Sequence, residues 1–250
     1  MIKIKKQNEI ELMKKSCQIL SEVKQIVWDS IRPGISTQEL DDIAYDEIIK
    51  RGAKPAFKGY QGFPGTACIS VNEELIHGIP SKTKTIKKGD IVKVDMGAIW
   101  KGWYSDSAFT KGVGKISDKD QKLINIAKDA FYIGLDAIKP GARVGDISHA
   151  IGKFVKSKGL FVPSQFTGHG IGKSLHEAPY IPNEGTANTG PLLKNGMTIC
   201  IEPMILQQSN QVKILEDKWT VVSVHNKNTA HYEHTVLIED GVGKILTGGI

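Results

Sequence analysis

Cysteine is scarce in this chain. Only three of the 250 residues are cysteines, Cys17, Cys68 and Cys200, and no two of them form a CxxC pair. An odd number of widely spaced cysteines does not make a disulfide framework and suits a reducing compartment. Long apolar runs are absent too, since none reaches the roughly 20 residues that a membrane-spanning helix needs. The charged opening MIKIKKQNEI lacks the apolar core of a secretory signal. We therefore expect a cytoplasmic protein with no membrane partner.

Neither sign of charge dominates, because 33 basic residues stand against 27 acidic ones, a net charge of +6. Lysines gather loosely around residues 3–15 and 82–88. This pattern suits a solvated surface or attraction to a polyanion such as ribosomal RNA. The solvated surface is favoured, because no nucleic-acid fold motif and no interleaving of arginine with aromatic residues is present. We expect no DNA binding and leave ribosome association open. We also expect a monomer, because no heptad or long apolar surface pattern occurs.

The chain contains an internal repeat with an offset of 107 residues. Residues 89–95 (GDIVKVD) are echoed by residues 196–202 (GMTICIE), and each segment ends on a carboxylate. Pro-Gly at 33–34 and 140–141, and a basic residue followed by glycine at 51–52 and 158–159, keep the same offset. Several coincident features at one long period indicate a duplicated half-domain. We predict a single catalytic domain over 1–250, with duplication of roughly 8–106 and 115–213.

Each half reads as helix, Pro-Gly stop, helix and then strands. Before the first stop, apolar residues recur at steps of three or four, the spacing of a helix with one buried face: Ile10, Met13, Cys17, Leu20, Val23, Val27 and Ile31. Before the second stop the same steps occur at Leu123, Ile126, Ala127, Ala130 and Ile133. Further helices are predicted around residues 38–51 and 145–158. Hydrophobic content of 40% suffices for a substantial core.

Five residues with metal-binding side chains stand out in the strand and glycine-turn regions. Asp95 and Glu202 end the two echoed strands. Asp106 lies eleven positions after Asp95, across a turn-prone Lys-Gly pair, so a hairpin would bring the two carboxylates together. His169 lies in TGHGIG, where glycines let the backbone approach closely, and Glu233 lies in the β-rich run YEHTVLI. Each residue alone has an ordinary structural explanation, but together they indicate one site.

Four carboxylates in one pocket repel one another, and without cations some would stay protonated. Two divalent ions would neutralise the set. Oxygen ligands with one imidazole favour Co, Mn, Fe or Zn in an oxygen-rich site over a thiolate-type structural zinc. Paired ions lower the pKa of a shared water and polarise a carbonyl. The alternative, a structural cation site, explains fewer of the surrounding histidines, so we predict a two-metal hydrolase.

Two more histidines flank this set. His77 precedes Gly-Ile-Pro, and His176 follows His169 by seven residues, which is not the spacing of a helical zinc motif. We therefore predict that both donate to a carbonyl oxygen or an amide nitrogen and are not ligands. The other histidines are expected to be structural: His149, His225, His231 and His234. His234 should point away from its neighbour Glu233 if that strand is regular. Cys200 is expected to be a buried spectator.

Five segments in one order cover nearly the whole chain: VNEELIHGIP, VDMGAIWKGWYSD, TGHGIGKSLHEAP, IEPMI and YEHTVLI. Together they resemble the type I methionine aminopeptidases, in the short form without an N-terminal zinc-binding extension. The resemblance implies the α/β "pita-bread" fold, with two pseudo-symmetric half-domains around a curved antiparallel sheet and helices outside. It also implies an enzyme that hydrolyses the initiator methionine from nascent proteins and peptides with a small second residue.

The same resemblance implies roles for the site residues. The metal ligands would be Asp95, Asp106, His169, Glu202 and Glu233, with Asp106 and Glu233 bridging the two ions. A hydroxide shared by the ions would attack the methionine carbonyl, and Glu202 would relay a proton. His176 would steady the oxyanion, and His77 would contact the substrate near the scissile amide.

The methionine pocket follows from the resemblance as well. Tyr60, Phe63 and Trp219 match positions that bind the substrate side chain, and aromatic rings suit a polarizable thioether. The alternative for these aromatics is an ordinary core. Phe57 stands where many bacterial members carry a cysteine, and Leu175 stands where an aromatic is common. These two departures affect the shape of the pocket and leave the five metal-binding residues intact.

Two other functions remain as alternatives. Prolidases and Xaa-Pro aminopeptidases share the fold and the ligand set, so cleavage before proline is the enzymatic alternative. A scaffold that has lost its metals is the second, although all five ligand types are retained. Only 31 residues separate Glu202 from Glu233. This gap leaves no room there for the helical insertion of type II members.

Overall fold

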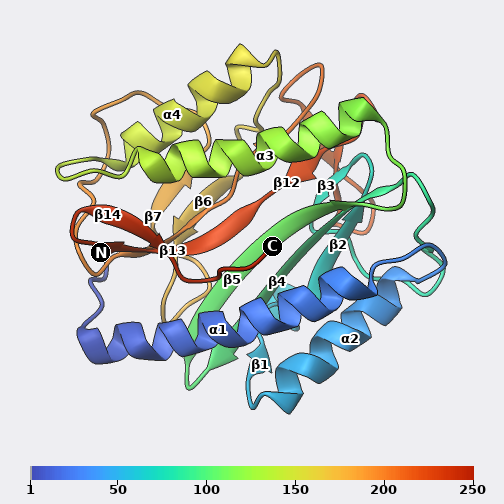
Figure 1. The fold of residues 1–250 in the computed structure, drawn as a ribbon, viewed down its shortest axis with the longest axis horizontal. Helices are drawn as coiled ribbons and strands as arrows, with labels where there is room; N and C mark the ends of the chain where they lie inside the picture. Colours follow the sequence, from blue (N-terminus) through green and yellow to red (C-terminus); the bar gives the residue numbers. More distant parts are fainter. Residues whose placement is uncertain (1) are drawn as a thin grey trace.

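The computed structural model describes residues 2–250 and consists of four helices packed on a curled sheet (Figure 1). The sheet has nine strands in the order β1-β4-β5-β13-β8-β6-β7, with β2 added to β4 and β14 added to β13. All its neighbouring strands pair antiparallel. Its strands are β1 (Lys54–Pro55), β2 (Ala67–Val71), β4 (Ile91–Trp100), β5 (Trp103–Gly112), β6 (Thr167–Gly170), β7 (Glu177–Pro182), β8 (Thr198–Ile201), β13 (Glu233–Glu239) and β14 (Val242–Ile245).

The helices fall where the apolar spacing predicts them, as α1 (Gln7–Ser30), α2 (Thr37–Lys50), α3 (Asp118–Asp136) and α4 (Val144–Ser157). Ser36 caps α2 by accepting a hydrogen bond from the backbone N–H of Glu39, whose carboxylate accepts from the N–H of Ser36 in return. Ser117 caps α3 in the same way by accepting from the N–H of Asp120. The predicted helices are thus confirmed to within a few residues at their ends.

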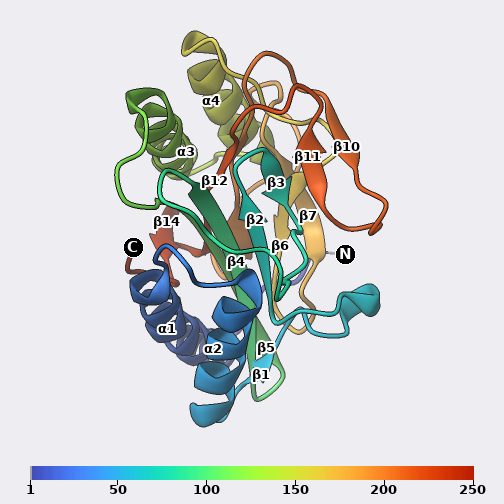
Figure 2. The same cartoon turned by 90° about the vertical axis from the view of Figure 1, so that its right-hand side faces the viewer.

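The helices lie together on one side of the sheet (Figures 1 and 2). The first pair, α1 and α2, buries its apolar face with residues of β2, β4 and β5 in one core cluster. The second pair, α3 and α4, packs with residues of β8 and β13 in another cluster. The opposite face of the sheet is consequently left to form a site. This arrangement confirms the predicted α/β architecture with a curved antiparallel sheet and helices outside.

Smaller strands border the open face of the sheet. A three-stranded sheet has the order β10 (Val212–Ile214), β11 (Val221–Ser223) and β3 (Glu74–Ile76), and β12 (Ala230–His231) pairs with β9 (Met204–Ile205). A short 3-10 helix, η1 (Tyr60–Gly62), lies in the loop before β2. Figure 2 shows β3, β10 and β11 on the side of the sheet away from the helices. The duplication of 8–106 and 115–213 within one domain stays a prediction.

Within residues 2–250, no helix has both the length and the apolar character needed to span a lipid bilayer.

Candidate metal centre

The open face of the sheet gathers carboxylates from strands far apart in the sequence. Asp95 in β4 pairs with Ala108 in β5, and Glu233 in β13 pairs with the same Ala108 from the other side. Cross-strand partners share a face of the sheet, so both carboxylates project to the same side. Asp106 precedes Ala108 by two residues and therefore shares this face as well. The predicted hairpin between Asp95 and Asp106 is confirmed as the β4–β5 pair.

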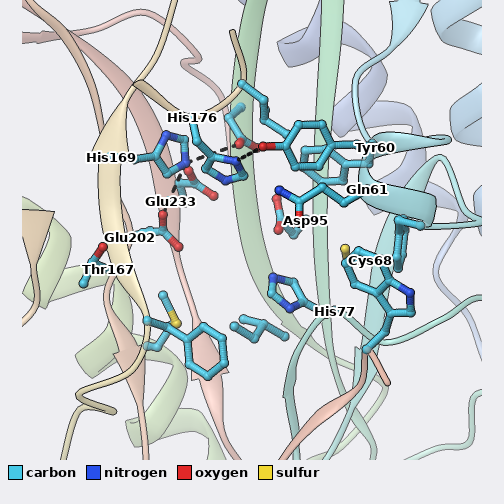
Figure 3. A pocket seen from close by; sticks show the side chains of 18 residues that line it. Tyr60, Gln61, Cys68, His77, Asp95, Thr167, His169, His176, Glu202 and Glu233 are labelled. Atoms are coloured by element: carbon cyan, nitrogen blue, oxygen red, sulfur yellow. Dashed lines mark hydrogen bonds and ion pairs between the residues drawn. The ribbon is translucent and has the colours of Figure 1, made fainter. Parts of the chain in front are cut away.

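The other half of the sheet supplies the imidazole and the fourth carboxylate. Thr235 in β13 pairs with Cys200 in β8, which in turn pairs with His169 in β6. Glu202 follows Cys200 by two residues and lies just beyond the end of β8. Side chains from five neighbouring strands, β4, β5, β13, β8 and β6, therefore project from the same face of the sheet. All five residues that the sequence singled out line one cavity of about 210 Å³ (Figure 3).

His169 is oriented by its own backbone. Its Nδ1 lies 2.9 Å from the carbonyl oxygen of Gly170, an acceptor, so Nδ1 carries the proton. The Nε2 lone pair then faces two carboxylates, 3.5 Å from Glu202 Oε1 and 3.8 Å from Asp106 Oδ2. A hydrogen bond on one ring nitrogen that directs the other toward an ion is typical of metal-binding histidines.

Buried oxygen atoms of the cluster have no partner among the described residues. They are Asp95 Oδ1, Asp106 Oδ1 and Glu233 Oε1. A buried carboxylate oxygen without a partner carries a desolvation cost, and that cost persists until a cation or a proton satisfies it. A bound cation would therefore stabilise this cluster of carboxylates.

Burial raises the pKa of Asp95 to about 6. It also raises the pKa values of Asp106, Glu202 and Glu233 well above their usual range, and neighbouring carboxylates add to each shift. Burial lowers the pKa of His169 to about 3, so this imidazole is neutral and free to donate its lone pair. Carboxylate oxygens around a neutral imidazole are donors that divalent ions such as Mn, Fe, Co and Zn accept. The side chains present are therefore suitable ligands for divalent metal ions.

Cys200 lies within this cluster without adding a thiolate. Its Sγ can be grouped with ligand atoms of Asp106, His169 and Glu233. Burial and the nearby carboxylates raise the pKa of the thiol well above its usual range, and Sγ lies 3.7 Å from Thr235 Oγ1. The protonated thiol is a poor metal ligand. The prediction of a buried spectator agrees with this environment.

His176 and His77 border the cavity on either side of the cluster (Figure 3). The ring of His176 lies 4.3 Å from that of His169, centroid to centroid, and its Nδ1 lies 2.8 Å from the hydroxyl oxygen of Tyr60. His77 has a left-handed backbone with φ 58°, which is rare for a residue with a side chain and is typical of functional sites. Its ring packs edge-on against Trp219.

An apolar wall adjoins the polar cluster in the same cavity. Tyr60, Phe63 and Trp219 line it as predicted, and the rings of Phe63 and Trp219 pack 5.1 Å apart in an edge-to-face pair. Phe57 and Leu175 line it too. Six further residues line the cavity and were not among the predicted site residues: Gln61, Cys68, Ile76, Phe166, Thr167 and Met204. Thr167 and Met204 lie two residues from His169 and Glu202, so strand alternation could have found them, whereas Cys68 and Phe166 have no such signal.

The sequence predicts an ordinary structural role for His231, but the structure places its ring beside two carboxylates of the cluster. Its Nε2 lies 3.7 Å from Glu202 Oε2 and 4.0 Å from Glu233 Oε2. The available signal was strand alternation, because a residue two positions before Glu233 shares its face. His234, by contrast, points away from Glu233 as predicted. Its ring nitrogens contact Thr247 and Tyr232 behind the sheet.

The antiparallel fold and its buried cluster of carboxylates and histidine define a metal-dependent hydrolase. The model of metallopeptidase family M24 matches residues 11–240. The chain therefore belongs to metallopeptidase family M24.

Individual proteins of this family differ in how similar they are to this chain. Methionine aminopeptidase 1 of Bacillus subtilis is 47% identical over 247 residues, which cover 99% of each chain. The crystal structure of methionine aminopeptidase from Thermotoga maritima superposes with a TM-score of 0.97 at 42% identity and covers 100% of both chains. The prolidase of Pyrococcus furiosus gives a TM-score of 0.81 at 28% identity, and the match covers 99% of this chain but 66% of the prolidase. The family resemblance read from the sequence motifs is confirmed.

Proposed function

We propose that this chain is a type I methionine aminopeptidase that removes the initiator methionine from nascent proteins and peptides with a small second residue. The observation that carries the proposal is the juxtaposition of four carboxylates and one imidazole with an aromatic-lined wall in a single cavity. Full-length identity of 47% to a methionine aminopeptidase supports the same substrate. Identity to a prolidase is lower, at 28%, so proline-specific cleavage is the less favoured activity.

The metal ligands in this proposal are Asp95, Asp106, His169, Glu202 and Glu233. Their carboxylate oxygens and Nε2 of His169 would hold the two ions. When two divalent ions are bound, they lower the pKa of a water and polarise the scissile carbonyl. The metal can be Co, Mn, Fe or Zn, because all four accept carboxylate and imidazole donors.

His176 supplies a hydrogen bond to the carbonyl oxygen of the substrate as that oxygen gains negative charge. The Tyr60 hydroxyl lies 2.8 Å from Nδ1. When Tyr60 donates to Nδ1, the imidazole proton resides on Nε2, where it can point into the cavity. A donor held in place before the reaction stabilises the developing oxyanion without reorganisation.

His77 and Glu202 act on the amide side of the scissile bond. Burial lowers the pKa of His77 to about 4, so the ring is neutral near pH 7 and can share a hydrogen bond with the substrate amide. Glu202 accepts a proton from the attacking water and delivers it to the leaving amine. Burial, together with the charge of the nearby Asp95, raises the pKa of Glu202 above its usual range.

The aromatic wall receives the methionine side chain. Tyr60, Phe63 and Trp219 form the binding surface, since a thioether packs favourably on aromatic rings. Phe57 and Leu175, both buried, complete the wall and set its shape.

The partners in this proposal are the N-termini of nascent polypeptides, met in the cytoplasm by a monomeric enzyme. Exposed lysines in the segments 3–15 and 82–88 offer positive charge for ribosome association. This positive charge would attract the enzyme to ribosomal RNA near the point where the nascent chain emerges, and so raise the local concentration of the enzyme at its substrate.

The test compares release of the N-terminal residue from Met-Ala-Ser and from Ala-Pro-Ser. Protein is first stripped with a chelator and then titrated with Mn, Fe or Co, and Asp106→Asn serves as the control for the metal centre. We expect metal-dependent methionine release from Met-Ala-Ser only, and near-complete loss of cleavage for Met-Arg-Ser. Alanine release before proline would instead identify the proline-specific activity. If neither peptide is cleaved and no metal is bound, the remaining interpretation is a scaffold that has lost its metals.

A further inference from the structure

His231 is a buried imidazole whose ring lacks any hydrogen bond. The residue is 1% exposed, and neither Nδ1 nor Nε2 has a partner within residues 2–250. Its backbone is held firmly, because the Thr110 hydroxyl accepts from the His231 N–H at 2.9 Å and donates to the His231 carbonyl at 2.7 Å. Leaving a buried donor unpaired costs about 1–3 kcal/mol. A rigidly held ring with this cost points to a partner in the loaded site.

Glu202 is the partner that the geometry offers. Its two oxygens face two different imidazoles, with Oε1 3.5 Å from His169 Nε2 and Oε2 3.7 Å from His231 Nε2. His169 has the orientation of a ligand, since its Nδ1 contacts the Gly170 carbonyl. His231 has no such contact on Nδ1. The two rings therefore differ in their surroundings: His169 is held by a backbone carbonyl, whereas His231 Nε2 faces only carboxylates, Glu202 Oε2 at 3.7 Å and Glu233 Oε2 at 4.0 Å.

We propose that His231 is a positioning residue of the metal centre, which donates a hydrogen bond from Nε2 to Glu202 Oε2 and so turns Oε1 toward the ion. The inference rests on the metal centre of the proposed function. A hydrogen bond from N–H to oxygen spans about 2.7–3.2 Å, so the 3.7 Å gap closes by a small rotation of the carboxylate when a cation holds Oε1. Outer partners of metal-bound carboxylates typically contribute 10–100-fold to metal affinity or activity.

The backbone also links His231 to the segment that holds Glu202. The backbone of β12 pairs His231 with Met204, two residues after Glu202. The imidazole is thus carried by a strand that is bonded to the segment holding Glu202. A donor built on this paired strand fixes the carboxylate more closely than one on a loop.

The experiment uses three variants and needs no substrate. His231→Leu removes the donor while filling most of the space, His231→Gln keeps an amide donor, and His149→Gln on the exposed surface of α4 is the matched control. Metal-free proteins are titrated with Mn or Co by calorimetry. We expect His231→Leu to weaken binding by about 10–100-fold with the number of ions at saturation unchanged. His231→Gln should keep most of the wild-type affinity, and His149→Gln all of it.

Other outcomes overturn the inference in distinct ways. Wild-type affinity in His231→Leu would show that the ring has no part in the centre. Equal loss in His231→Leu and His231→Gln, with a changed visible spectrum of the Co-loaded protein, would make His231 a direct ligand. If His231→Leu does not fold, His231→Ala replaces it, with thermal unfolding of the metal-free proteins as the check. Failure of the wild type itself to bind a divalent ion would refute both the proposed function and this inference, whereas metal binding that His231→Leu leaves unchanged would refute this inference alone.

Discussion

Asp95 and Glu233 lie on either side of one small residue, Ala108, which pairs with both across β4, β5 and β13. Ala108 is completely buried. Its methyl group therefore lies on the same face of the sheet as the two carboxylates and between their strands. The sheet creates the site by placing a small side chain at the centre and acidic ones around it.

Enlarging Ala108 should damage the metal centre. We expect Ala108→Leu to weaken Mn binding by an order of magnitude or more, because the added carbons enter the space between the carboxylates. Overpacking also costs about 1–3 kcal/mol of stability. The matched control is Ala98→Leu, a buried alanine of β4 that faces the helices. It should lose comparable stability in urea unfolding and keep wild-type metal affinity. Equal affinity in the two variants would contradict the role of Ala108.

Thr235 anchors the backbone of Asp106 through one hydroxyl. Its Oγ1 accepts from the Asp106 N–H at 3.1 Å and donates to the Asp106 carbonyl at 2.8 Å. Thr235→Val keeps the shape and removes both bonds, so we expect a loss of about 1–3 kcal/mol in the free energy of unfolding. Metal affinity should fall as well, whereas Thr235→Ser, which retains the hydroxyl, should keep it. Urea unfolding and calorimetric titration measure the two effects, and unchanged metal affinity in Thr235→Val would show that the anchor does not position Asp106.

His176 should affect turnover and not metal content. His176→Ala removes the donor to the oxyanion, so we expect kcat on Met-Ala-Ser to fall by roughly 10²–10³. Tyr60→Phe removes the hydroxyl that holds Nδ1 and should lower kcat by a smaller factor. Metal analysis of both variants should match the wild type. Loss of an ion from His176→Ala would instead identify His176 as a ligand.

Metal binding should stabilise the protein more at pH 7.5 than at pH 5.5. Burial raises the folded-state pKa of Asp95 to about 6, above its unfolded value, and raises those of the other three carboxyls. In the metal-free protein such groups favour the fold while protonated, and this contribution is lost as pH rises through the folded pKa. Cations replace the lost protons, so their stabilising effect grows over the same window.

The measurement is the increase in Tm on adding Mn at each pH. His169 does not alter the expected sign, because burial lowers its pKa to about 3 and the ring is already neutral throughout the window. Asp106→Asn, which removes one carboxylate, should flatten the dependence. An increase in Tm that is the same at pH 5.5 and pH 7.5 would contradict proton competition at these carboxyls.

Much of the fold could be predicted from local patterns in the sequence. The steps of three and four from Ile10 to Ile31 predicted α1 because a helix repeats every 3.6 residues and buries one face. Pro33 and Gly34 marked its end, and Ser36 marked the start of α2. Strand alternation placed Cys200 and Glu202 on one face before any pairing was known. These features depend on neighbours in sequence, and a single sequence displays them directly.

Pairing between distant strands was not visible in the same way. The order β5-β13-β8 inserts β13, a strand from late in the sequence, between two earlier ones and brings Glu233 beside Ala108. No local rule specifies that insertion, because it depends on which strand edges remain free once the helices have packed. The assignment of the metal ligands and the duplication remain predictions for the same reason, since both concern relations between segments.

The sequence by itself determined the helices, the carboxylate-ended strands, the family and the residue types that a divalent metal requires. It did so because periodicity, capping and motif order are properties of neighbouring residues. Only the tertiary structure decided that His231 belongs beside Glu202, that Ala108 separates Asp95 from Glu233, and that Phe57 and Leu175 share a wall with Trp219. Those relations arise from long-range strand pairing and packing, which join residues that no spacing along the chain connects.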